Sequence, residues 1–215
     1  MSNKSNEIVL KLIVVGDSRV GKTSLIYSYM HNSFPEKTTP TIGLEHEDKT
    51  INLKGLIIKI QIWDTGPLEY NHFLFLSNDF LRNTDGIILV FDLANKKSFN
   101  DIKDLITQKK DILSDPRIKK IIVGNKSNIK DKVKVTINDI KCLLKPNKIK
   151  FREISAYDNE NIQKVFNELI NSIVGNKTNE ELIAEYGNSK DNKDILNLAM
   201  SNIDMQENKK NCCCC

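Results

Sequence analysis

Strand and helix patterns alternate along the chain from about residue 7 to residue 174. The apolar runs 87–91 and 121–123 are continuous, as in central parallel strands that helices cover on both faces. Two β-rich runs meet at Leu53-Lys54-Gly55, which predicts an antiparallel hairpin at one edge of the sheet. We therefore predict an α/β fold with a doubly wound, mostly parallel sheet of six strands and five flanking helices. The expected strands are residues 7–15, 45–52, 54–63, 86–92, 119–125 and 148–154, and the expected helices are 22–31, 70–82, 98–113, 136–144 and 161–173.

The pattern changes after residue 174, where Asn, Asp and Lys dominate. We divide the chain into a flexible N-terminus (1–7), one folded domain (8–174) and a flexible tail (175–215). Apolar residues between 195 and 203 could form a short amphipathic helix for a partner or a membrane, or only a transient one. No apolar run approaches the length of a membrane span. The net charge of +4, without a basic stripe, argues against a nucleic-acid partner.

The sequence between residues 16 and 23 carries the strongest chemical signal. It reads GDSRVGKT and matches GxxxxGK[ST] between an apolar strand and a helical pattern. Gly16 and Gly21 let the backbone curl, so that its amides and the next helix N-terminus attract anionic oxygens. Lys22 can reach the outer phosphates of a nucleotide, and the Thr23 hydroxyl can bind Mg²⁺. The predicted phosphate-binding residues are Gly16, Asp17, Ser18, Arg19, Val20, Gly21, Lys22, Thr23 and Ser24.

The chain has 5 cysteines, of which four are its last residues. Cys142 lies on an expected amphipathic helix, where we predict a core position. Four adjacent cysteines cannot easily form structural disulfides with a distant partner, and no second cluster follows a zinc-site spacing. We predict prenylation of Cys214 and Cys215, because two lipids anchor a protein stably whereas one is marginal. Unmodified thiols in a flexible tail are the alternative.

Four further segments follow at the ends of expected strands. Residues 41–43 read TIG, 63–66 read WDTG, 124–128 read GNKSN and 153–156 read EISA. Together with the phosphate loop and the cysteine terminus, this ordered set resembles the Ras superfamily of small GTPases, and within it the Rab branch. Residues 16–27 and 61–64 are similar to late-endosomal Rabs. The resemblance covers roughly residues 8–174 and the last residues, and it implies a P-loop G domain.

The resemblance implies a role for each matching residue, with GTP, GDP and Mg²⁺ as the bound groups. Thr23 and Thr41 would bind Mg²⁺ directly, and Asp64 would support the ion through water. Asn125 and Lys126 would hold the base. Phe34 would contact the edge of the base, and Ser155 and Ala156 would close over it. Lys22, Thr41 and the residue at position 68 would take part in hydrolysis.

The resemblance also implies partners and a location. Thr41 would move in when a γ-phosphate is present and order the first switch for effectors. An exchange factor, a Rab escort protein, a prenyl transferase and a dissociation inhibitor are the other implied partners. We expect the cytoplasmic face of intracellular membranes, those of endosomes by the same resemblance, and the cytosol after extraction.

The chain departs from the family in its second switch. Asp-Thr-Ala-Gly-Gln-Glu is usual there, whereas residues 64–69 read DTGPLE. Pro67 replaces a glycine whose N–H binds the γ-phosphate, and proline has no N–H. Leu68 replaces the glutamine that orients the attacking water, and leucine has no donor or acceptor. We therefore predict GTP hydrolysis that is slow or lost.

The base-recognition motif differs as well. Asn128 replaces an aspartate that accepts two hydrogen bonds from guanine, and its amide donor would face the guanine amino group. We predict that guanine affinity falls about ten- to a hundred-fold and that xanthine nucleotides gain in relative terms. Tyr157 replaces a lysine, a change we expect to be mild because the main base contact there is a backbone amide. Arg19 occupies a loop position where the family often has a small residue. Its side chain could point to solvent or toward the phosphates, and we favour solvent because Lys22 already serves the outer phosphates.

Two functions are compatible with these motifs. One is a prenylated, Rab-like nucleotide switch in vesicle trafficking with impaired hydrolysis. The other is a pseudo-GTPase that acts as a constitutive, lipid-anchored adaptor. A P-loop kinase for small molecules is disfavoured, because nothing in the sequence resembles a lid with clustered arginines. The nucleotide that the purified protein carries discriminates the first two.

Overall fold

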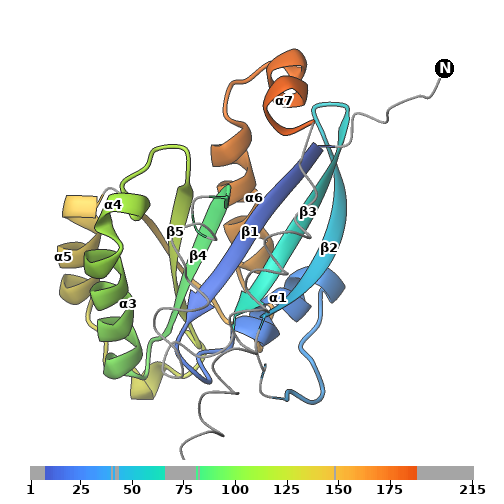
Figure 1. The fold of residues 1–215 in the computed structure, drawn as a ribbon. Helices are drawn as coiled ribbons and strands as arrows, with labels where there is room; N and C mark the ends of the chain where they lie inside the picture. Colours follow the sequence, from blue (N-terminus) through green and yellow to red (C-terminus); the bar gives the residue numbers. More distant parts are fainter. Residues whose placement is uncertain are drawn as a thin grey trace, which may run out of the picture.

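The structure, a computed structural model, describes residues 8–39, 41, 44–65, 81, 83–147 and 149–187. A sheet with the strand order β2-β3-β1-β4-β5-β6 forms its centre (Figure 1). β2 pairs antiparallel with β3, and every other pairing in the sheet is parallel, which confirms the predicted hairpin edge. The strands are β1 (Ile8–Gly16), β2 (Leu44–Leu53), β3 (Leu56–Thr65), β4 (Gly86–Asp92), β5 (Lys119–Asn125) and β6 (Lys150–Glu153).

Six α-helices lie in the described part of the chain and cover both faces of the sheet. One face carries α1, α6 and α7, and the other carries α3, α4 and α5 (Figure 1). A short 3₁₀ helix, Lys130–Lys132, follows β5. The helices are α1 (Lys22–His31), α3 (Lys96–Gln108), α4 (Lys110–Leu113), α5 (Ile137–Asn147), α6 (Ile162–Val174) and α7 (Asn179–Tyr186).

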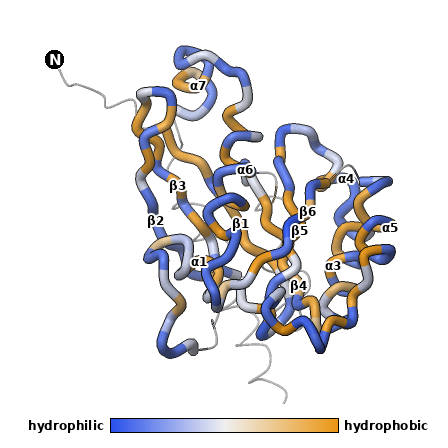
Figure 2. The backbone as a smooth tube through the Cα atoms, turned by 180° about the vertical axis from the view of Figure 1, so that it is seen from behind, coloured by the Kyte–Doolittle hydropathy of each residue, from blue (hydrophilic) through white to orange (hydrophobic). Residues whose placement is uncertain are grey.

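The central strands are buried on both faces. In β4, Ile88 and Val90 pack in the core under α1 and α6, while Ile87 and Leu89 pack in the core under α3 and α5. A period of two in side-chain direction therefore fills both layers from one continuous apolar run. The outer helices have a different hydropathy pattern from the central strands. Figure 2 shows apolar and polar stretches alternating along α3 and α5. This is the amphipathic pattern of helices that lie on a sheet.

The parallel strands bring their carboxyl ends to one edge of the sheet. Gly16 of β1 pairs with Val90 of β4, and Asp92 of β4 pairs with Asn125 of β5. The loops that leave these strands therefore converge, as expected for a ligand site in a doubly wound sheet. The predicted phosphate and base motifs both lie at this edge.

Two helix predictions need correction. The expected single helix 98–113 is two helices, because Lys109, with φ −103° and ψ 23°, leaves the helical conformation. The break lets both Ile112 and Leu113 turn into the core. The predicted core position of Cys142 is wrong, because this side chain is exposed. α5 buries Ile140 and Leu143, and at about 100° per residue Cys142 falls on the opposite side of the helix.

The ordered domain continues beyond residue 174. α7 begins with a capping box between Thr178 and Glu181, and its Leu182 is fully buried. The expected flexible tail therefore contains a helix that is docked on the domain. The expected helix 70–82 lies outside the described residues apart from buried Leu81, as do residues 1–7 and 188–215. Within the described ranges, no helix has the length and apolar character needed to cross a bilayer.

Candidate functional site

The phosphate loop leaves β1 at Gly16 and enters α1 at Lys22. Gly21 has φ +94°, a left-handed conformation that favours glycine, and a Cβ there would lie 2.4 Å from Asn125 Nδ2. A Cβ on Gly16 would lie 2.3 Å from the Val90 carbonyl oxygen. Both positions are thus closed to larger residues by neighbouring strands. Arg19 is exposed, has φ +60° and lines the pocket described below.

Lys22 is buried inside this loop. Its Nζ donates hydrogen bonds to the carbonyl oxygens of Gly16 at 2.9 Å and Asp17 at 3.0 Å. Burial lowers the pKa of the Lys22 ammonium, although the charges of Asp64 and Asp17 oppose this shift. A cation held here by backbone carbonyls is positioned to exchange those contacts for phosphate oxygens.

The three predicted metal-binding residues meet beside Lys22. Thr23 Oγ1 donates to Asp64 Oδ2 at 2.5 Å, Thr41 Oγ1 donates to the same oxygen at 3.0 Å, and the two hydroxyls are 2.9 Å apart. The other carboxylate oxygen, Asp64 Oδ1, is buried without a hydrogen-bond partner among the described residues. Burial raises the pKa of Asp64, while the hydroxyls and Lys22 act in the opposite direction.

This donor set fits Mg²⁺. Two hydroxyls and a carboxylate are hard oxygen ligands, and Mg²⁺ in phosphate sites takes few protein ligands because it keeps waters and phosphate oxygens. The unpaired Asp64 Oδ1 is a polar atom that an ion or its water would satisfy. The residues present therefore fit the metal that the sequence motifs imply.

The base motif is joined to the phosphate loop by Asn125. Its Nδ2 donates to the Val20 carbonyl oxygen at 2.8 Å, and its Oδ1 accepts from the backbone amides of Lys126 at 2.8 Å and Ala156 at 3.1 Å. Asn125 is buried, so these three bonds are shielded from water. One side chain therefore fixes the relative position of three loops.

The ammonium group of Lys126, the lysine of the same motif, has two partners within the protein. Lys126 Nζ donates to the Arg19 carbonyl oxygen at 2.9 Å and forms an ion pair with Asp92 at 2.8 Å. Ser155 is buried and exchanges hydrogen bonds with Asp158, which shapes the turn after β6. Asn128 is exposed and lines the pocket described next.

These loops enclose a pocket of about 620 Å³, a volume suited to a nucleotide. It brings together most of the predicted ligand residues: Ser18, Arg19, Gly21, Lys22, Thr23, Ser24, Phe34, Thr41, Asn125, Lys126, Asn128, Ala156 and Tyr157. Gly16, Asp17, Val20, Asp64 and Ser155 stand behind this lining and support it. Sequence reasoning missed Thr38, Thr39, Thr65 and Ile129, although the threonine-rich run 38–41 was a signal for the first two.

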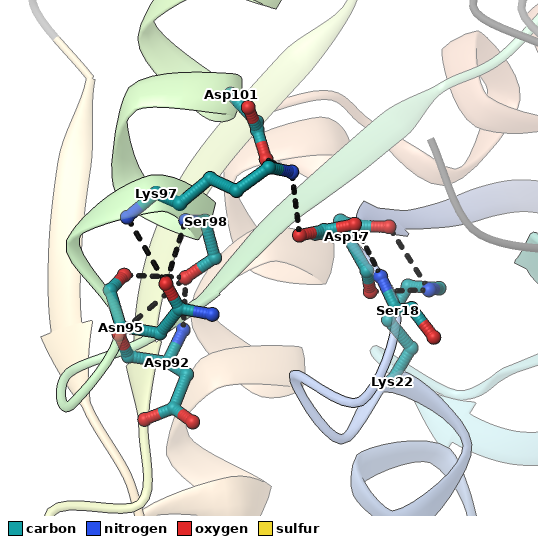
Figure 3. Close-up of polar contacts among 9 residues, drawn as sticks. Asp17, Ser18, Lys22, Asp92, Asn95, Lys97, Ser98 and Asp101 are labelled. Carbon is teal, nitrogen blue, oxygen red and sulfur yellow. Dashed lines mark hydrogen bonds and ion pairs between the residues drawn. The ribbon is translucent and has the colours of Figure 1, made fainter. Parts of the chain in front are cut away.

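A polar cluster that the sequence did not predict supports the loop from α3. Figure 3 shows Lys97 reaching from α3 to Asp17, with Nζ 3.4 Å from Asp17 Oδ2 and 3.0 Å from Asp101 Oδ2. Asn95 caps α3 by accepting from the amides of Lys97 and Ser98. Asp17 is buried and Lys97 is exposed, so the pair anchors the loop at the protein surface.

The residues that carry two of the predictions lie outside the described ranges. These are Pro67 and Leu68 of the second switch, and Cys214 and Cys215 at the terminus. Their roles stay predictions from the sequence.

Comparisons with known proteins show the family to which the chain belongs. A protein-family model, the Ras family, matches residues 11–175. GTP-binding protein ypt2 of Schizosaccharomyces pombe is 34% identical over 197 residues, which are 92% of this chain and 96% of the relative. GTP-binding protein YPT1 of Saccharomyces cerevisiae is 32% identical, covering 91% and 93%. Ras-related protein Rab-8A of Gallus gallus is 36% identical, covering 76% and 77%. The likeness to late-endosomal Rabs stays a prediction, but the chain belongs to the Ras family and, within it, to the Rab small GTPases.

Proposed function

We propose that this chain is a Rab-type nucleotide switch of vesicle membranes that binds GTP and GDP with Mg²⁺ and hydrolyses GTP slowly. The observation that carries the proposal is the convergence of Thr23, Thr41 and Asp64 beside the buried Lys22. These four side chains come from three separate elements and share one small volume at the carboxyl edge of the sheet. A polyphosphate with its ion is the ligand that uses all of them.

The chain's own residues would divide the work of holding the nucleotide. The loop amides and Lys22 would bind the phosphates, and the Thr23 and Thr41 hydroxyls would bind Mg²⁺ with Asp64 behind them. A magnesium ion held there would neutralise part of the negative charge of the phosphates. Thr41 lies in the loop between α1 and β2, so its engagement would couple the ion to the effector-facing first switch.

We propose that the base-recognition motif binds guanine more weakly than in other members of the family. Asn128 offers one acceptor where the family's aspartate offers two, and it brings an amide donor opposite the guanine amino group. Losing one charge-assisted bond corresponds to about ten- to a hundred-fold in affinity. Xanthine carries an oxygen at that position and would accept from Asn128, so the relative affinity for xanthine nucleotides should rise.

The hydrolytic step is proposed to be impaired by the second switch. Without the backbone N–H that Pro67 lacks, the γ-phosphate loses a donor. Without a polar side chain at Leu68, the attacking water loses the group that orients it. An arginine from an activating protein would add little, because the glutamine that it works with is absent.

Membrane attachment completes the proposal. Residues 188–215 would connect the domain to prenyl groups on Cys214 and Cys215, and two lipids give stable anchoring. Effectors would meet the first switch. An exchange factor, an escort protein with its prenyl transferase, and a dissociation inhibitor would handle loading, lipidation and extraction.

The second candidate is a pseudo-GTPase that serves as a constitutive adaptor. The observation in its favour is that three family residues are replaced in one chain. Pro67 replaces the glycine that binds the γ-phosphate, Leu68 the glutamine that orients water, and Asn128 the aspartate that binds guanine. Fold and lipid anchor would then persist without turnover. The well-formed magnesium and phosphate site argues for the switch.

Chromatography of nucleotide released by heat from freshly purified protein separates the two candidates. Bound GDP indicates turnover, bound GTP indicates a switch with very slow hydrolysis, and an empty site that takes up no purine triphosphate with Mg²⁺ would leave the adaptor. Single-turnover hydrolysis by a Pro67→Gly, Leu68→Gln double variant should exceed that of the wild type. Affinities for GTP and XTP in wild type and Asn128→Asp test the base end, where the variant should gain GTP affinity and lose XTP affinity.

A further inference from the structure

A lysine-rich run follows the base-recognition motif and continues along α5. Residues 130–145 contain five lysines and two aspartates, a net charge of +3, which is most of the +4 that the whole chain carries. The sequence shows no basic stripe here, because three apolar residues, Val135, Ile140 and Leu143, stand between the charged positions. Folding buries these three, while all five lysines are exposed: Lys130, Lys132, Lys134, Lys141 and Lys145.

The five lysines, together with exposed Val133 and Ile137, form a surface that we call the α5 patch. Ile137, Lys141 and Lys145 follow one another at intervals of four on α5, so they form one stripe along the helix. The other members lie in the 3₁₀ helix and in the loop that leads directly into this stripe. Figure 1 shows α5 at the outer margin of the fold, where a stripe of this kind can meet a large surface.

Little negative charge opposes the patch. None of the ion pairs among the described residues includes any of the five lysines. Asp139 is paired with Lys96 of α3 and accepts hydrogen bonds from Thr136, so its charge is compensated. Asp131 is exposed and is the other carboxylate of the run. The patch therefore presents five positive charges against one negative charge.

Two aliphatic side chains protrude among these charges. Val133 is 47% exposed and Ile137 is 65% exposed, and the third exposed large aliphatic residue of the described ranges is Ile57. The run contains no aromatic residue and no arginine. Surfaces that bind single-stranded nucleic acids use stacking rings, and arginine is the residue that grips a phosphate with two bonds. Lysines mixed with protruding aliphatic groups are instead typical of surfaces that lie on an anionic bilayer.

We propose that the α5 patch is a docking surface for membranes that contain anionic lipids. A lysine ammonium is a compact, hydrated point charge, so it suits a diffuse layer of headgroups and needs no shaped pocket. Each lysine near such a layer strengthens binding by about five-fold. The two aliphatic side chains would enter the boundary between headgroups and acyl chains.

This placement leaves the first switch accessible. The sheet order has β2 at one edge and β6 at the other, and Figure 1 shows α5 on the side of the molecule away from β2. A domain that lies on α5 therefore directs the β2–β3 hairpin away from the bilayer. Thr41, in the segment that leads into β2, would stay open to partners.

The test is sedimentation of the full chain, without lipid groups, with phosphatidylcholine vesicles that contain or lack about 30% phosphatidylserine, at about 0.1 M salt. The wild type should bind only the anionic vesicles and should be released at about 0.5 M salt. A Lys141→Glu, Lys145→Glu double variant should bind at least about 20-fold more weakly. The matched control, Lys37→Glu with Lys164→Glu, makes the same charge change at exposed positions outside the patch and should stay within about three-fold of the wild type.

Ile137→Ser tests the apolar part of the patch, because it leaves every charge in place. We expect it to weaken binding to the anionic vesicles by about three- to ten-fold, since part of an isoleucine side chain no longer leaves water. The residue is 65% exposed, so its urea midpoint should match that of the wild type. Unchanged vesicle binding by this variant would remove the aliphatic contact from the proposal.

The opposite outcomes overturn the proposal. Equal losses in the two double variants would mean that net charge alone attracts the protein, and a wild type that left anionic vesicles unbound would exclude the docking surface. Binding of poly(U) RNA that depended on Lys141 and Lys145, without vesicle binding, would assign the patch to a nucleic acid instead. None of these measurements involves bound nucleotide or lipidated cysteines, so the nucleotide released by heat tests the proposed function separately.

Discussion

The docked tail helix α7 can be tested with one substitution, Leu182→Ala. Leu182 is fully buried in the core that β1 and α6 share. The segment before the helix is fixed at the β2–β3 turn, where Lys54 Nζ donates to the carbonyl oxygens of Gly175 at 3.0 Å and Lys177 at 3.1 Å. Removing the isobutyl group leaves a cavity under a helix that is otherwise held by partly buried Ile183 and Tyr186.

The magnitude follows from two limits. Replacing a buried leucine by alanine costs about 2–5 kcal/mol in a core that cannot collapse. α7 is the last described element, so it can also detach locally, and the loss of stability cannot exceed the free energy with which it docks. We therefore expect a loss of about 2–3 kcal/mol in the free energy of unfolding, with α7 opening before the sheet.

The assay is urea unfolding at a fixed, saturating concentration of Mg²⁺ and GDP, because bound ligand adds to apparent stability. Hydrogen exchange at the amides of Leu182 and Gly187, which bond within α7, reports local opening. Ile137→Ala is the control, since an isoleucine that is 65% exposed should cost under about 0.5 kcal/mol. An unchanged midpoint together with unchanged exchange in Leu182→Ala would refute the docking of α7.

Three further predictions follow from the site and the sheet. Gly21→Ala should cost about 1–3 kcal/mol of stability and weaken Mg²⁺–GDP binding in calorimetry, because φ is +94° and the new methyl meets Asn125; wild-type binding would contradict this. Asn125→Ala should lower the free energy of unfolding by about 1–3 kcal/mol in urea, because the buried Val20 carbonyl loses its donor. Burial raises the pKa of Asp85 to about 6, so the folded state binds protons more readily than the unfolded state. Stability should therefore fall by about 2 kcal/mol as pH rises from 4 to 7, and Asp85→Asn should flatten this profile of urea midpoints.

The sheet and the phosphate loop could be read from the sequence because both depend on local patterns. The run 87–91 is short and apolar at every position, as is typical of a strand covered on both faces. The glycines of GDSRVGKT stand where the structure needs a left-handed φ and close backbone contact. Thr41 and Asp64 were predicted to bind or support Mg²⁺ from their motifs, and the structure brings their oxygens within hydrogen-bond distance.

The features that sequence reasoning missed depend on contacts distant in the chain. Lys97 supports Asp17 across 80 positions, and no local spacing links the two. α7 lies in a polar stretch with few apolar residues, and it folds because Leu182 finds a pocket in a core built by distant strands. Cys142 was misplaced because an amphipathic helix shows which residues are apolar, while packing selects which of them face the sheet.

The proposed changes in hydrolysis and in base recognition act in opposite directions on the time that the protein stays loaded. Intrinsic hydrolysis in this class runs at about 4 × 10⁻⁴ s⁻¹, a half-life of about half an hour, and losing the functions of positions 67 and 68 would lengthen it. A weaker base contact at Asn128 shortens the time that nucleotide stays bound, since affinity changes fall mainly on dissociation. Once release is faster than hydrolysis, exchange with free nucleotide resets the protein, and the bound state follows the GTP to GDP ratio around it. The strength of the base contact, rather than the second switch, would then set how long this protein stays loaded.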